Sequence, residues 1–318
     1  MRAACSSCDS GLTMPNLTPP EIPAELRALM AEIGPKWATD TKGHIKLMID
    51  EFSKLLKHAP KHGVDVETNI AYGPHERQAF DVYRPQSGPQ TGRPGLIFVH
   101  GGAFTEGRRD RTSEIYANVL YYFARHGIVG INAGYRLAPE ARYPEATRDI
   151  AKVLTWMRAN AKELGVDADR IFLMGHSAGG AHVGSYAFDR RHQADNGHGL
   201  AGVLIISGRV RADGHAHNPN ALRVAEYYGH DATVHEDVSP VSHVDTDSPP
   251  TFIACAEFEN PLIDVYCFEL AYKLAAAKRK APPFMWLKDH NHTSIIGQFN
   301  TADDALGRAC LEFIRTAG

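Results

Sequence analysis

The chain has 318 residues, of which 43% are hydrophobic and 22% charged, and its formal net charge is −3. This is ordinary globular composition, and the charge balance gives no reason to expect nucleic acid or an anionic membrane surface as a partner. No apolar run approaches the ~20 residues that a membrane span needs, and the N-terminal segment lacks the apolar core of a signal peptide. We therefore expect a cytoplasmic protein without a membrane span, and leave its oligomeric state open, a homo-oligomer included.

Cysteine and histidine spacing does not favour a metal site or a disulfide framework. The five cysteines are scattered, and Cys5 and Cys8 form one C-x-x-C without a second pair. His215 and His217 alternate in a polar segment that lacks a third ligand at a fitting distance. The sequence thus predicts no bound metal, and the role of the Cys5/Cys8 tail stays open.

Predicted elements alternate along the chain. Two helices are expected between residue 23 and about residue 61, followed by two strands that end at Pro85. Beyond them, apolar strands and helices take turns. Strands are expected at 96–100, 128–135, 170–175, 200–208, 251–258 and 283–288, and helices at 113–127, 144–165, 178–188, 264–279 and 302–317.

This order indicates an α/β fold with one mostly parallel central sheet flanked by helices. Strands that are apolar throughout are typical of a sheet covered on both faces. The simplest division has an N-terminal tail with cap helices at residues 1–65 and one catalytic domain at 66–318. Ligands of such sheets bind at the carboxyl ends of the strands, where the residues that follow each strand gather.

One serine stands at such a strand end. Gly175-His176-Ser177-Ala178-Gly179 matches G-x-S-x-G, between an apolar strand and a helix. A sharp strand-to-helix turn forces the middle residue into a strained positive-φ conformation, and its flanking positions have room only for glycine. The pattern predicts that Ser177 is a nucleophile beside a helix N-terminus that favours negative charge.

The segment HGGAF at 100–104 supplies the donors that such a serine needs. It ends another apolar strand, and its glycines let backbone N–H groups approach a substrate carbonyl oxygen. We expect an oxyanion hole made by the N–H groups of Gly102, Ala103 and Ala178. His100 is expected to brace this turn.

A base and a carboxylate should follow the serine in that order. His292 is the first candidate for the base and His290 the alternative, because both follow the last strand. Glu259 is the first candidate for the acid, in the turn after the strand at 251–258, and Asp264 is the alternative.

With these motifs and the YRLAPE stretch at 135–140, the chain resembles an α/β-hydrolase of the hormone-sensitive-lipase-like carboxylesterase group. Arylformamidases and feruloyl esterases are relatives that share the HGGA variant. The resemblance covers roughly residues 75–318 and implies ester hydrolysis through an acyl-serine, with no cofactor and with an N-terminal helical cap. AEFENP replaces the usual Asp-Pro-Leu pattern, which bears on the choice of the acid.

The substrate is therefore expected to be a small-molecule ester, with an activated amide such as an N-formyl-aryl compound as the alternative. A non-catalytic binding protein of the same fold is a second alternative. Arg209 and Arg211 follow a strand end, where either could pair with a substrate carboxylate or with local acidic residues. Phe104 is expected to line an apolar part of the pocket, with plain packing as the alternative.

Overall fold

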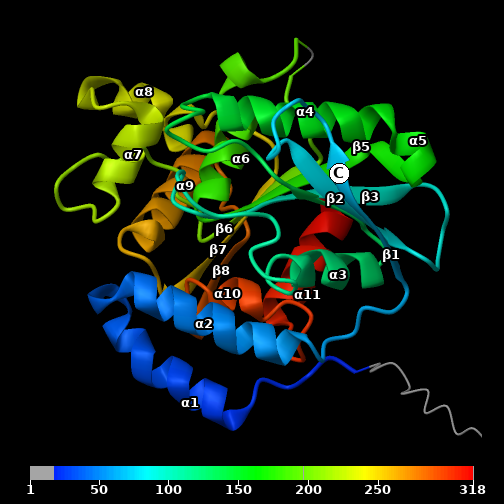
Figure 1. The fold of residues 1–318 in the computed structure, drawn as a ribbon. Coiled ribbons are helices and arrows are strands. Elements are labelled where there is room, and N and C mark those ends of the chain that lie inside the picture. The colour runs from blue at the N-terminus through cyan, green and yellow to red at the C-terminus, as the bar shows by residue number, and fades with distance from the viewer. Residues whose placement is uncertain (1–17, 196, 318) are drawn as a thin grey trace, which may run out of the picture.

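Eight strands form one sheet in the computed structural model, which describes residues 18–195 and 197–317 (Figure 1). The strand order is β1-β2-β4-β3-β5-β6-β7-β8, and β2 runs antiparallel to both neighbours while the pairs from β4 to β8 are parallel. The strands are β1 Val64–Ala71, β2 Ala79–Pro85, β3 Arg93–Val99, β4 Val129–Ala133, β5 Val166–His176, β6 Gly202–Ile206, β7 Thr251–Phe258 and β8 Phe284–Asn291.

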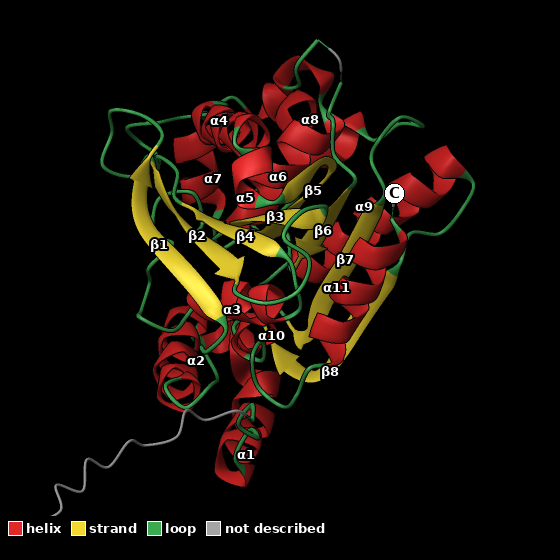
Figure 2. Cartoon of the chain, turned by 90° about the vertical axis from the view of Figure 1, so that its right-hand side faces the viewer, coloured by secondary structure: helices red, strands yellow, loops and turns green. Residues whose placement is uncertain are grey.

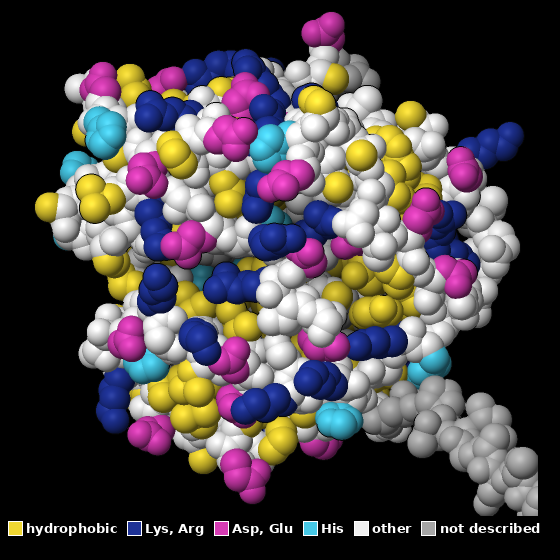
Figure 3. All heavy atoms as spheres, in the orientation of Figure 1, with side chains coloured by type: hydrophobic (Ala, Val, Ile, Leu, Met, Phe, Trp, Pro, Cys, Tyr) yellow, Lys and Arg dark blue, Asp and Glu magenta, His cyan; other side chains and the backbone are white. Residues whose placement is uncertain are grey.

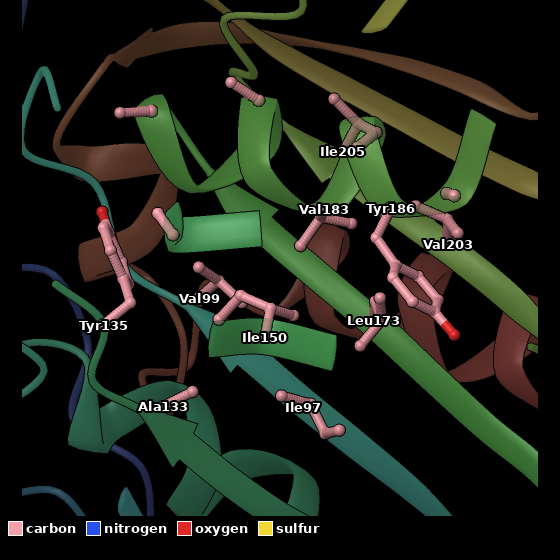
Figure 4. Packing of buried hydrophobic residues seen from close by; sticks show 14 of the residues in the cluster. Ile97, Val99, Ala133, Tyr135, Ile150, Leu173, Val183, Tyr186, Val203 and Ile205 are labelled. Carbon is pink, nitrogen blue, oxygen red and sulfur yellow. The ribbon is translucent and has the colours of Figure 1, made fainter. Parts of the chain in front are cut away.

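The central strands are apolar on both sides because helices cover both faces of the sheet (Figure 2). In β3, Ile97 and Val99 belong to one buried cluster, and Leu96 and Phe98 belong to the other. Successive side chains of a strand point to opposite faces of the sheet, and here the side chains on both faces are buried in a hydrophobic core. Figure 4 shows the first cluster, in which Ile97 and Val99 lie with residues of β5, β6 and α6.

Helices on the first face surround α6, and helices on the second face surround α3 and α11. The first set comprises α4 Glu145–Ala159, α5 Ala161–Leu164, α6 Ala178–Phe188, α7 Ala221–Tyr228 and α9 Ile263–Lys278. The second comprises α1 Ala24–Ile33, α2 Thr41–Leu56, α3 Ala117–Arg125, α10 Ser294–Gly297 and α11 Ala305–Thr316. The short elements are η1 Gly34–Thr39, η2 Arg190–His192, η3 Ala232–Val234, α8 His235–Val238 and η4 Pro240–His243.

The N-terminal helices are attached to the second face. Met48, Phe52 and Leu56 recur at helical spacing on α2 and are fully buried, and each such side chain contributes roughly 1.5–3 kcal/mol of hydrophobic stabilisation. Asp40 caps α2 by accepting the N–H of Gly43 at 3.0 Å. The division of the chain at residue 65 stays a prediction, and Cys5 and Cys8 lie outside the described residues.

The predicted fold class is confirmed, and several element boundaries are corrected. The helix expected at 144–165 is interrupted at Asn160, whose side chain donates to the carbonyl of Trp156 at 2.8 Å. The helix expected from residue 113 begins at Ala117, because Tyr116 before it has φ 77°. The last strand runs on to Asn291, and α10 was not expected. None of the helices described is long and apolar enough to cross a membrane.

Candidate active site

A strained turn carries the serine at the carboxyl end of β5. Ser177 has φ 55° and ψ −122° and stands between the last residue of β5 and the first of α6. A Cβ on Gly175 would lie 2.5 Å from the Gly179 oxygen, and one on Gly179 would lie 2.2 Å from the Val99 oxygen. Backbone atoms cannot move aside cheaply, so both positions accept only glycine. The turn presents Ser177 at the wall of a cavity of about 570 Å³.

The 101–104 turn lies directly against this serine. A Cβ on Gly101 would be 2.8 Å from Ser177 Cβ, and one on Gly102 would be 1.8 Å from the Glu106 oxygen. Gly102 and Ala103 line the cavity and have positive φ values of 150° and 49°. Within the described chain, their N–H groups have no protein acceptor. They are therefore free to donate to a ligand oxygen.

Ala178 completes the donor set predicted from the sequence. It is the first residue of α6, so its N–H belongs to the helix N-terminus and has no partner within the helix. The N-terminal end of a helix carries a partial positive charge that favours an anion. The three predicted donors thus come from two adjacent strand ends, β3 and β5.

His100 supports the turn from behind. Its ring stacks on Tyr135 with centroids 4.4 Å apart, and the Tyr135 hydroxyl donates to the His100 carbonyl at 2.8 Å. Burial lowers the pKa of His100 to about 3, so the imidazole is neutral at neutral pH. The side chain is fully buried, which matches the bracing role expected of it.

The candidate acid and the candidate base meet at the ends of β7 and β8. His292 Nδ1 donates to Glu259 Oε2 at 2.5 Å, and both side chains are almost fully buried. The other carboxylate oxygen, Oε1, accepts the Ala256 N–H at 2.8 Å and the Ser207 hydroxyl. Glu259 therefore has a fixed orientation, and it fixes the tautomer of His292.

The alternative residues face elsewhere. His290 Nδ1 contacts the Ser294 hydroxyl at 3.1 Å, and its Nε2 lies 3.4 Å from Asp303. The Asp264 carboxylate accepts the N–H of Val265 at 2.9 Å in the first turn of α9. Of the residues weighed from the sequence, the structure brings together Ser177, Glu259 and His292, since Ser177 and His292 line the same cavity.

The comparisons with known proteins find similarity to esterases. The family model BD-FAE matches residues 80–195. Esterase LipC of Mycobacterium tuberculosis is 32% identical over 200 residues, which cover 58% of this chain and 49% of LipC, so the chain matches about half of that relative's length. Versiconal hemiacetal acetate esterase of Dothistroma septosporum is 26% identical over 276 residues, which cover 78% of this chain and 82% of that esterase.

Among solved structures, esterase B from Lactobacillus rhamnosis superimposes on this chain with a TM-score of 0.69 at 19% sequence identity. The superposition covers 91% of this chain and 95% of esterase B. The chain has the α/β-hydrolase fold. The likeness to esterases of the hormone-sensitive-lipase-like group, which the motifs indicated, is confirmed by these relatives.

Two residues missed by sequence reasoning hold the candidate base and acid in place: His176 contacts the loop of His292, and Ser207 contacts Glu259. His176 Nε2 donates to the His292 carbonyl at 3.0 Å, and the two rings lie 4.8 Å apart. Burial lowers the pKa of His176 well below its ordinary value, which keeps the ring neutral. Ser207, which donates to Glu259, follows β6, the neighbour of β7. Its place after a strand end was the signal that could have pointed to it.

The N-terminal helices contact the acid loop. Trp37 Nε1 donates to Asn260 Oδ1 at 2.8 Å, and Asn260 directly follows Glu259. Both side chains are buried. Residues of α2, among them Ile45 and Ile49, form one wall of the cavity that Ser177 lines. The N-terminal segment therefore shapes the site as well as the core.

Two of the residues expected to contact substrate do not reach the cavity. Phe104 is 1% exposed and stacks on Tyr227 with centroids 4.9 Å apart, because its φ of 71° turns it into the core. Arg211 forms ion pairs with Glu236 and Glu269 and is absent from the cavity lining. Arg209, by contrast, is buried and lines the cavity. No group of three or more His, Cys, Asp or Glu side chains among the described residues could hold a metal ion.

Proposed function

We propose that this α/β-hydrolase cleaves carboxylic esters through an acyl intermediate on Ser177. The observation that carries the proposal is the His292–Glu259 pair at a cavity that Ser177 also lines. The printed names of LipC and of versiconal hemiacetal acetate esterase, both esterases, support the same reaction class.

The contacts support a specific order of steps. Because His292 Nδ1 donates to Glu259, Nε2 is the free base nitrogen, and it takes the proton from Ser177 Oγ as that oxygen attacks the ester carbonyl. The carbonyl oxygen of the ester becomes negative and accepts hydrogen bonds from the N–H groups of Gly102, Ala103 and Ala178. Each such hydrogen bond contributes roughly 10²- to 10³-fold to the rate. His292 then passes its proton to the leaving alkoxide. A water molecule, deprotonated by His292, attacks the acyl-serine, and Ser177 takes the proton back as the carboxylic acid product leaves.

A serine-directed fluorophosphonate tests the nucleophile. We expect one covalent adduct on the wild-type chain, located at Ser177 by peptide mass spectrometry, and none on Ser177→Ala. Absence of an adduct from a folded wild-type chain would favour the non-catalytic binding protein over the hydrolase.

A pair of matched substrates tests the bond that is cleaved. Phenyl formate and formanilide carry the same formyl group on a phenyl ring and differ in the bond that is cleaved, and the phenoxide of the ester leaves more readily than the nitrogen of the amide. We expect the larger kcat/KM on the ester, measured by phenol and aniline release. A clear preference for formanilide would assign arylformamidase chemistry to the same triad.

A further inference from the structure

A buried arginine stands beside the nucleophile turn. Arg209 lies two residues after Ser207, at the carboxyl end of β6, and its backbone N–H donates to the Ser177 carbonyl at 2.9 Å. The side chain is 2% exposed and lines the same cavity as Ser177. Arg209 is therefore part of the wall of the space that a substrate of Ser177 would occupy.

Among the described residues, this guanidinium has no carboxylate within ion-pair distance, although the Tyr266 side chain and, more remotely, the Asp213 carboxylate interact with it electrostatically. Among the described residues, Arg209 forms no ion pair, and its buried Nη1 has no hydrogen-bond partner. Its aromatic neighbour is Tyr266, whose ring lies 5.6 Å from the guanidinium carbon. The Tyr266 hydroxyl in turn donates to Asp213 at 2.7 Å, so that carboxylate is engaged with the phenol.

The contrast with Arg211 is informative because the two side chains leave the same loop. Arg211 is paired with two glutamates, and its Nε donates to Glu269 at 2.7 Å. A buried cation without a directly paired anion is costly to keep. Arg209 thus combines a buried guanidinium, whose Nη1 has no hydrogen-bond partner, with a place in the cavity wall.

The rim of the cavity is also cationic. Lys42, Lys46, Arg111 and Arg223 line it, whereas Glu106 is the one carboxylate among its lining residues. Two of these cations are neutralised locally, Lys46 by Asp50 and Arg223 by Glu106. Lys and Arg side chains gather around the hollow between the N-terminal helices and the rest of the molecule (Figure 3). Such a rim raises the local concentration of anions and speeds their entry.

We infer that the substrate is an ester that carries a carboxylate, and that Arg209 receives this carboxylate inside the cavity. The inference rests on the proposed function and adds the charge of the substrate to it. Arginine suits the task because its planar donors match the two oxygens of a carboxylate. Specificity of this kind is strong, because a substrate without the anion leaves the buried cation unpaired.

Two pairs of esters that differ by one carboxylate test the inference and locate the charge. Mono-4-nitrophenyl glutarate against 4-nitrophenyl pentanoate places it on the acyl side, and 4-acetoxybenzoate against 4-methylphenyl acetate places it on the alcohol side. We expect wild-type kcat/KM, corrected for spontaneous hydrolysis, to favour the anionic member of at least one pair by about 10-fold or more.

Arg209→Met removes the charge and keeps much of the volume, and Arg211→Met is the matched control from the same loop. In Arg209→Met we expect kcat/KM for the preferred anionic ester to fall roughly 30-fold or more, while its neutral partner changes by less than about 3-fold. Arg211→Met is expected to keep the wild-type preference. Equal rates of fluorophosphonate labelling at Ser177 show that each variant retains its fold and nucleophile.

The outcomes separate this inference from the proposed function. If the neutral esters are hydrolysed and Ser177 is labelled, but neither anionic ester is preferred by the wild-type chain, the substrate charge is wrong and the hydrolase stands. The same holds if Arg209→Met leaves the preference unchanged. If no ester is hydrolysed and Ser177 is not labelled, the proposed function itself fails. The wild-type comparison decides the question even if Arg209→Met does not fold.

Discussion

Replacing Glu259 with glutamine is the most direct test of how the base is oriented. The carboxylate accepts three hydrogen bonds: Oε1 from Ala256 N–H and Ser207, and Oε2 from His292 Nδ1. A glutamine can keep the first two only by placing its carbonyl oxygen there. Its NH₂ group then faces Nδ1, so His292 must carry its proton on Nε2 and can no longer accept one from Ser177.

The opposite amide orientation is worse, because it sets NH₂ against the buried Ala256 N–H, which can only donate. One orientation is therefore imposed, and it selects the unproductive tautomer. We expect kcat to fall roughly 10³- to 10⁴-fold, which is about 4–5.5 kcal/mol of transition-state stabilisation. Since the side-chain volume hardly changes, the fold and substrate binding should be retained.

The assay is initial-rate hydrolysis of 4-nitrophenyl acetate by the wild type, Glu259→Gln and the matched control Asp264→Asn. Asp264 is the alternative carboxylate, and its side chain accepts the Val265 N–H in the first turn of α9. The control should stay within about 2-fold of the wild type, as surface changes usually do. A loss in Asp264→Asn with Glu259→Gln near wild-type activity would refute the assignment of the acid.

Two further predictions concern stability. Burial holds the pKa of His100 and of His182 at about 3, below the ~6.5 of an unfolded chain, so only the unfolded state takes up these protons as the pH falls below ~6.5. Between pH 7.5 and pH 5, each histidine should therefore lower the free energy of unfolding by about 2 kcal/mol. Urea unfolding at the two pH values measures this loss. If His182→Gln loses as much stability between them as the wild type, the prediction is contradicted. Trp37→Phe leaves the buried Asn260 oxygen without its donor and should cost roughly 1–3 kcal/mol by the same method. An unfolding midpoint equal to that of the wild type would show that this contact contributes nothing.

The parts of the site that depend on local sterics were readable from the sequence. A serine between glycines after an apolar strand has few alternatives, because backbone atoms of the 99–101 segment and of α6 leave no room for a Cβ. The order of the motifs likewise predicted which loops would meet, since parallel strands end at one edge of the sheet. The sheet, the serine turn and the choice of Glu259 as first candidate all follow from such reasoning.

Side-chain directions in loops were not readable. Phe104 sits beside the donors of the 101–104 turn in the sequence, yet a positive φ turns it toward Tyr227. The contact between Trp37 and Asn260 joins positions 223 residues apart, and no local pattern encodes it. Arg209 and Arg211 are alike in sequence, but in the fold Arg209 is buried in the cavity wall whereas Arg211 pairs with Glu236 and Glu269.

Under the two proposals made above, the end of β6 joins orientation of the base to recognition of the substrate. Ser207 holds the carboxylate that orients His292, and Arg209 faces the cavity from two residues further on. The bond from this loop to the Ser177 carbonyl uses the backbone N–H of Arg209, which any residue other than proline retains. The side chain at position 209 can therefore change while the serine turn and the His292–Glu259 pair keep their positions. On this argument, the charge that the cavity accepts is set independently of the groups that perform the chemistry.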